Sequence, residues 1–173
     1  MRLKTILQMA ETCSRRIDRT AFLIVRSAIW DLEADGEVRK RAEQLGHEIV
    51  GRMGFSDVED VCEWLQGIGC GEVQVDVQED EEDELVADMG YDNVVVYDCI
   101  SCCGAPETGK TLCALEGGLI QGMVAAVEGR EYYAIEYACW GLGDGRCAFA
   151  LVPKEDDGGC RRVHELVRER VHG

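Results

Sequence analysis

The 173-residue chain contains 34 acidic side chains and 18 Lys and Arg side chains, so its formal net charge is -16 at pH 7. A charge of this sign repels nucleic-acid phosphates and anionic membrane surfaces, so neither is an expected partner. The hydrophobic content of 46% is enough for one compact domain with a sizeable core. We expect a single domain over residues 1–173, with a helical portion (1–69) and a sheet-containing portion (70–173).

The sequence starts without the apolar core of a signal peptide, and no apolar run approaches the roughly twenty residues of a membrane span. We therefore expect a cytoplasmic protein, in which most of the ten cysteines are metal ligands rather than disulfides. Heavy use of Glu, Arg and Val with a single asparagine, Asn93, indicates a heat-adapted source, where intracellular disulfides do occur. Four cysteines thus stay open as core thiols or bridges: Cys13, Cys62, Cys70 and Cys160.

The spacing of apolar residues predicts helices over 3–13, 20–30, 36–53 and 58–68, with Ser56 and Asp57 capping the last of them. Alternating valines predict a strand over 72–77, and a run of valines predicts a strand over 93–97 that is buried on both faces. Between these strands, residues 79–84 are all acidic, which is typical of a solvated loop and less often of an interaction patch.

An apolar helix is predicted over 112–127, followed by a strand over 132–137, a glycine-rich turn over 141–145 and a strand over 147–152. The tail, 161–171, has apolar residues at helical spacing and is expected to dock on the domain. The predicted fold class is α+β, with N-terminal helices packed on an antiparallel sheet.

Cys113, Glu136, Cys139 and Cys147 have the types and spacing of a closed metal site. Cys113 opens the apolar helix, where the helix dipole lowers the pKa of a thiol toward the thiolate that a metal needs. The hairpin brings Glu136, Cys139 and Cys147 to one end. Three thiolates and one carboxylate suit tetrahedral zinc and leave no position for a catalytic water. The alternative is a set of small buried thiols beside a surface glutamate.

Residues 113–122 and 136–149 resemble the vinyl-4-reductase domain family. That family pairs a cysteine-led, glycine-rich helix with a Glu-x-x-Cys, a Gly-Asp turn and a Cys-x-Phe strand. The resemblance is specific over 113–152, diffuse over 21–97, and absent from the acidic run.

The resemblance implies an α+β ligand-binding fold related to heme-based nitric oxide sensors and to Golgi tethering subunits. In aromatic-sensing transcription activators with such a domain, one cysteine, one glutamate and two further cysteines hold a structural zinc. The matching positions are Cys113, Glu136, Cys139 and Cys147. The family name comes from a proposed reduction of a vinyl group in a chlorophyll precursor, and it is a poor guide to activity.

Residues 104–111 satisfy the phosphate-loop pattern, in which backbone amides wrap phosphates and a lysine neutralises them. Too few residues follow for the crossovers of a nucleotide-binding parallel sheet. We therefore expect an inert turn with Lys110 exposed.

Cys99, Cys102 and Cys103 add a Cys-x-x-Cys, a common half of a zinc or iron-sulfur site. They could form a second metal site, displace Glu136 from the first, act as a redox pair, or be spectator thiols. The ligand set is open at this point.

Gly118 and Gly122 give the apolar helix a face without side chains, which suits either close packing on the sheet or a dimer contact. Tyr133, Trp140 and Phe149 lie in or beside the hairpin strands and could line an apolar pocket or belong to the core.

We expect a non-enzymatic, zinc-binding domain that binds or senses a small hydrophobic molecule, forms a homodimer through helices, and acts through an unknown output protein. No Ser-His-Asp site and no metal-like histidine pairing is visible. The alternatives are a nucleotide-binding protein that uses residues 104–111, a tetrapyrrole vinyl reductase, and a redox or metal carrier.

Overall fold

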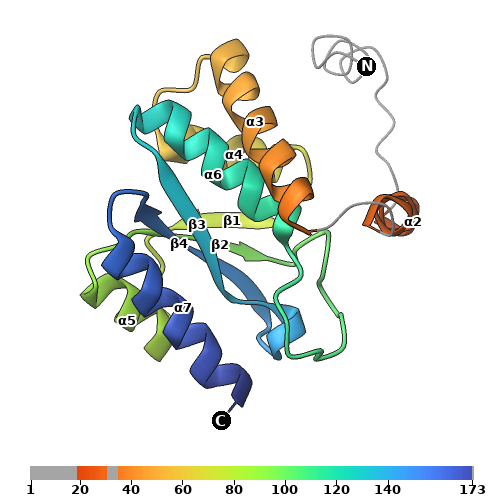
Figure 1. Cartoon of the computed structure of the whole chain (residues 1–173). Coiled ribbons are helices and arrows are strands. Elements are labelled where there is room, and N and C mark those ends of the chain that lie inside the picture. Colours follow the sequence, from red (N-terminus) through yellow and green to blue (C-terminus); the bar gives the residue numbers. More distant parts are fainter. Residues whose placement is uncertain (1–18, 31–34, 173) are drawn as a thin grey trace.

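The computed structural model describes residues 19–30 and 35–172, which form an antiparallel sheet with helices on both faces (Figure 1). The sheet order is β1-β2-β4-β3, with β1 (Glu72–Val75), β2 (Asn93–Tyr97), β3 (Tyr132–Ala138) and β4 (Arg146–Pro153). One face carries α3 (Asp35–Met53), α4 (Val58–Gly67) and α6 (Ala114–Glu128); the other carries α5 (Glu81–Asp88) and α7 (Asp157–His172). The predicted α+β class is confirmed.

The remaining elements are α2 (Arg19–Trp30), beside the N-terminus of α6, and the single turn η1 (Trp140–Leu142) within the hairpin. The helix expected over 3–13 lies outside the described residues. The other expected elements are present within a few residues of their predicted ends. In the part of the chain that the structure describes, no helix combines the length and apolarity needed to cross a membrane.

The valines of β2 explain why this strand is buried on both faces. Val94 and Val96 pack with Phe149 in a core cluster beneath α3, α4 and α6, whereas Val95 packs with Tyr137 in a second cluster beneath α5 and α7. Successive side chains of a strand point to opposite faces, so three consecutive valines serve two cores. β2 pairs with β4 in a register that places Val96 opposite Cys147.

The glycine face of α6 packs against α3 of the same chain. A methyl group added at Gly122 would lie 1.9 Å from the Glu43 carbonyl oxygen, and one at Gly118 would lie 2.4 Å from the Arg39 carbonyl oxygen. Gly46 of α3 makes the matching approach to α6. The expectation that Gly118 and Gly122 pack on the sheet or form a dimer contact is therefore wrong, because α3 already covers this face.

The acidic run is not a solvated loop, as the sequence suggested. Asp80 caps the N-terminus of α5 by accepting from the Asp83 amide, and four acidic residues fill the first turn, where the helix dipole favours them. Asp83 is fully buried and pairs with Arg146 at 2.9 Å. Tyr137 also donates to Asp83, at 2.5 Å. This ion pair ties α5 to β4 across the second core cluster.

Gly122→Ala should destabilise the protein by about 3 kcal/mol, because the methyl group would force α6 and α3 apart. Gly51→Ala is the matched control: nothing lies within 4 Å of a methyl group at this exposed position of α3. It should stabilise by up to about 1 kcal/mol through helix propensity. Urea unfolding of both variants checks this, and similar effects in the two would contradict the close contact.

Asp83→Ala should cost about 3 kcal/mol, because it leaves Arg146 paired only with the half-exposed Asp80. Glu84→Ala removes an exposed charge from the same helix and should change the free energy of unfolding by less than about 0.5 kcal/mol. Thermal and urea unfolding measure both. Equal, small effects would mean that the acidic run is only a solvated surface.

Candidate metal centre and adjoining pocket

Five cysteines from four segments meet on the face of the sheet beneath α6, and we refer to them as the thiol cluster. Cys99 and Cys102 come from the turn after β2, Cys113 from the N-terminus of α6, and Cys139 and Cys147 from the hairpin of β3 and β4. Each is at most 2% exposed. A group of this size cannot be explained by the general tendency of single cysteines to be buried.

The sulfur atoms lie close together. The Cys102 sulfur is 3.0 Å from that of Cys147 and 3.2 Å from that of Cys113. The Cys113 sulfur is 3.6 Å from both Cys147 and Cys99. Tetrahedral zinc, with zinc–sulfur distances near 2.3 Å, holds its sulfur ligands about 3.8 Å apart, so the cluster already has nearly the required size.

A bulge in β3 brings Glu136 and Cys139 to the same face. Residues three apart in a regular strand point to opposite faces. Here the pairing of β3 with β4 shifts between Glu136 and Ala138, so Tyr137 and Ala138 both face the second core cluster. Cys139 consequently joins Glu136 on the side of Cys113. A Glu-x-x-Cys therefore works as a pair of metal ligands because the strand is bulged.

Turns hold the other ligands. Asp144 accepts from the Cys139 amide at 2.7 Å, which fixes the Gly-Asp turn against this cysteine. The Cys-x-x-Cys turn closes through a 2.9 Å bond from the Cys103 amide to the Cys99 carbonyl. Because Cys147 lies opposite Val96 near the end of β2, the turn that follows β2 lies beside Cys147.

Backbone amides at the start of α6 point at the ligands. The Cys113 amide donates to Glu136 Oε2 at 3.1 Å, and the Leu112 amide donates to the Cys139 sulfur at 3.3 Å. Glu136 Oε1 is buried without a hydrogen-bond partner. A buried carboxylate oxygen in this position is costly unless a cation or a proton meets it.

Two overlapping sets of four ligands result. The mixed set is Cys113, Glu136, Cys139 and Cys147, the four residues expected from the sequence; the four-thiol set is Cys99, Cys102, Cys113 and Cys147. Within each set the ligand atoms lie within 4.8 Å of one another. Cys103 belongs to neither set: it is partly exposed and lies 3.7 Å from an Asp98 oxygen.

The thiols and the carboxylate perturb one another. Burial, followed by the charge of Cys139, raises the pKa of Glu136 well above its ordinary value. Hydrogen bonds from Cys102 and Cys113 lower the pKa of Cys99 and that of Cys139, while the neighbouring thiols, Cys102 first, raise the pKa of Cys113. Protons are thus shared within the group, and bound cations would replace them.

Cys62, Cys70 and Cys160 are free thiols, so the disulfide alternative does not hold for them, and Cys13 lies outside the described residues. Burial raises the pKa of Cys62 to about 12, as expected for an inert core thiol.

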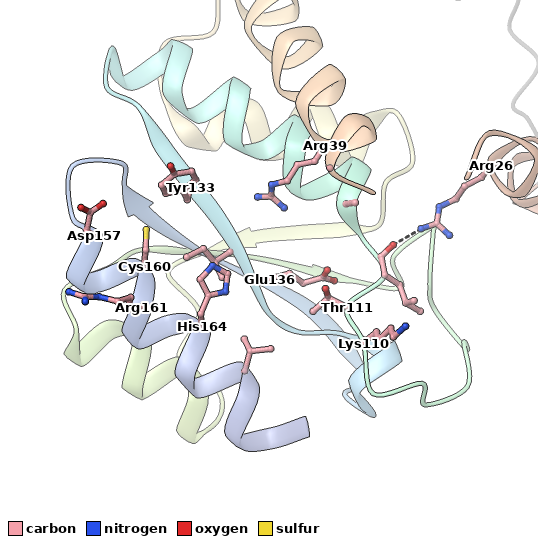
Figure 2. Close-up of a pocket in the computed structure, with 15 residues that line it drawn as sticks. Arg26, Arg39, Lys110, Thr111, Tyr133, Glu136, Asp157, Cys160, Arg161 and His164 are labelled. Carbon is pink, nitrogen blue, oxygen red and sulfur yellow. Dashed lines mark hydrogen bonds between the residues drawn. The ribbon is translucent and has the colours of Figure 1, made fainter. Parts of the chain in front are cut away.

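A cavity of about 970 Å³ adjoins the thiol cluster at β3, the edge strand of the sheet. Figure 2 shows Glu136 and Tyr133 on β3 between Arg39 of α3 on one side and His164 and Cys160 of α7 on the other. The walls combine apolar side chains (Leu112, Ile135, Val167) with basic ones (Arg26, Arg39, Lys110, Arg161). Glu136 belongs both to the cavity wall and to the mixed set.

Of the three aromatic residues expected at a pocket, Tyr133 lies on the wall. Trp140 and Phe149 do not: both pack in the first core cluster, and the Phe149 ring would lie 3.1 Å from a methyl group at Gly117. The residues that sequence reasoning missed, Arg39 and His164 among them, come from distant segments and share no motif.

Residues 104–111 do not form a phosphate-binding loop. The amides of Thr108, Gly109 and Lys110 donate to the Gly141 carbonyl at 2.8, 2.9 and 3.4 Å. They are therefore turned toward the hairpin instead of a phosphate. The sheet beside them is antiparallel, whereas phosphate loops follow strands of parallel sheets.

Residues 92–153 match the family model of the vinyl-4-reductase domain. Two uncharacterized proteins of Methanocaldococcus jannaschii are similar in sequence: MJ1642 is 48% identical over 56 residues, and MJ0150 is 34% identical over 116 residues. These matches cover 32% and 66% of this chain. They span 35% and 61% of the length of the two relatives, less than two thirds of either.

Two crystal structures share the fold. A vinyl-4-reductase family protein from Methanocaldococcus jannaschii superposes with a TM-score of 0.58 at 12% identity, covering 80% of this chain and 83% of that one. The phenol-responsive sensory domain of the transcription activator PoxR, solved with phenol, gives 0.60 at 18% identity, covering 88% and 83%. At these identities the likeness concerns the fold. The family expected from the sequence is confirmed, and the chain belongs to the vinyl-4-reductase domain family.

Proposed function

We propose that this protein is a small-molecule-binding sensory domain with a structural zinc centre. The observation that carries the proposal is the position of Glu136, which lines the cavity and also belongs to the mixed set of metal ligands. A molecule in the cavity would therefore touch a residue of the metal centre. The fold shared with the phenol-responsive domain of PoxR supports a sensory role.

The mixed set fits zinc. Its three thiols and one carboxylate are the donor types that zinc prefers, and all four side chains are buried. Zinc there would supply a structural cross-link between α6 and the hairpin. The four protein ligands fill a tetrahedral shell, so the site offers no place for a substrate.

The cavity suits a small hydrophobic molecule that carries a polar or acidic group. Leu112, Ile135 and Val167 offer apolar contacts, and Arg161 and Lys110 place positive charge at its rim. Basic groups gathered here are notable in a chain of net charge -16. A few polar groups in an otherwise apolar pocket orient a ligand and provide specificity.

The signal would pass from the ligand through β3 and α7 to a partner protein, and we propose that the sensory unit is a homodimer. A metal or redox carrier is a weaker alternative, because it needs exchangeable, exposed thiols. Cys99 and Cys102 are 0% and 2% exposed.

Cys139→Ser and Cys147→Ser should each abolish stoichiometric zinc retention and lower the unfolding temperature strongly, because a thiolate is the stronger zinc ligand. Glu136→Gln should have a smaller effect, since an amide oxygen still coordinates weakly. Cys103→Ser, outside both sets, is the control and should match the unmodified protein. Elemental analysis and thermal unfolding of the four variants check the order, and equal losses in all of them would contradict it.

Val167→Trp should fill the cavity and weaken binding of phenol and 2-naphthol at least tenfold, as measured by isothermal titration calorimetry. Leu85→Trp, on the exposed surface of α5, is the matched control and should leave binding unchanged. Native mass spectrometry of the unmodified protein should also show a retained small molecule or uptake of these probes. Absence of any apolar ligand, or equal loss in both variants, would contradict the sensory assignment.

A further inference from the structure

We infer that the centre holds two metal ions, bridged by the sulfur atoms of Cys113 and Cys147. This inference rests on the proposed metal centre and extends it from one ion to two. One ion would occupy the mixed set and the other the four-thiol set, and these sets share two residues, Cys113 and Cys147.

The number of ligands exceeds the needs of one ion. Five thiols and one carboxylate are gathered, and a single tetrahedral ion binds four of them. An ion in the four-thiol set would leave Glu136 buried beside Cys139, with Oε1 lacking a hydrogen-bond partner. An ion in the mixed set would leave Cys99 and Cys102 buried against the bound sulfurs. Two ions use all six ligands.

The sheet order places each ligand where a bridged pair of ions needs it. β4 lies between β2 and β3 and contributes Cys147. The turn after β2 supplies Cys99 and Cys102 on one side, and β3 supplies Glu136 and Cys139 on the other. Cys113 reaches the cluster from α6 above the sheet, with its sulfur 3.6 Å from that of Cys147. The two shared residues are thus central, and the unshared pairs flank them.

Charge also favours two ions. Full ionisation of the six ligands gives six negative charges, of which one dication offsets two and a pair of dications offsets four. Within 19–30 and 35–172, no Lys, Arg or His side chain forms an ion pair with Glu136 or a hydrogen bond with a cluster sulfur. Metal ions are therefore the available compensation for thiolates this deeply buried.

The test uses the full chain loaded with ¹¹³Cd²⁺, with native mass spectrometry for stoichiometry and ¹¹³Cd NMR for the environments. Two ions per chain are expected, with one resonance for a four-sulfur site and one for a site of three sulfurs and an oxygen. A scalar coupling between the two resonances, carried by the bridging sulfurs, is expected in the unmodified protein and needs no variant.

Paired variants separate the two sites. Cys99→Ser with Cys102→Ser should reduce the stoichiometry from two ions to one and remove the four-sulfur resonance, whereas Cys103→Ser should keep both ions. One ion per chain with a single resonance in the unmodified protein would overturn the two-ion inference and leave the zinc centre standing. No bound ion at all would overturn both.

Discussion

Six buried groups that ionise, five thiols and Glu136, lie together between α6 and the sheet, and their mutual repulsion is the constraint on which this part of the fold depends. Bringing them together requires α6 to approach the sheet closely, and Gly117, against the Phe149 ring, allows that approach. It also requires the bulge that turns Cys139 toward Glu136. Cations at the centre would convert this repulsion into a cross-link between α6, the hairpin and the turn after β2.

The same arrangement links the centre to the cavity. Glu136 is held by the Cys113 amide on one side and faces the cavity on the other, at the edge strand of the sheet. Arg39 of α3 donates to Gln121 of α6 and to a β3 carbonyl, so the cavity wall connects to the helical layer. A ligand that displaces Arg39 or α7 would therefore act on both layers of the fold.

Much of the fold follows from local patterns: the valines of β2, the hairpin and the tail helix have periodicities that leave few choices. The mixed ligand set was predictable because a hairpin brings both ends of its turn together. Other features depend on partners that local pattern does not specify. Small residues on α6 predict a close neighbour but not that it is α3, and the burial of Asp83 depends on Arg146, 63 residues away. The meeting of Cys99 and Cys102 with the mixed set depends on strand order.

X-ray absorption at the zinc edge, on protein purified without added metal, tests the metal centre most directly. A bound zinc in this centre should give a first shell dominated by sulfur at about 2.3 Å, with a minor oxygen contribution from Glu136. A protein that is folded and free of zinc, or a zinc shell of oxygen and nitrogen only, would contradict a centre built from the thiol cluster.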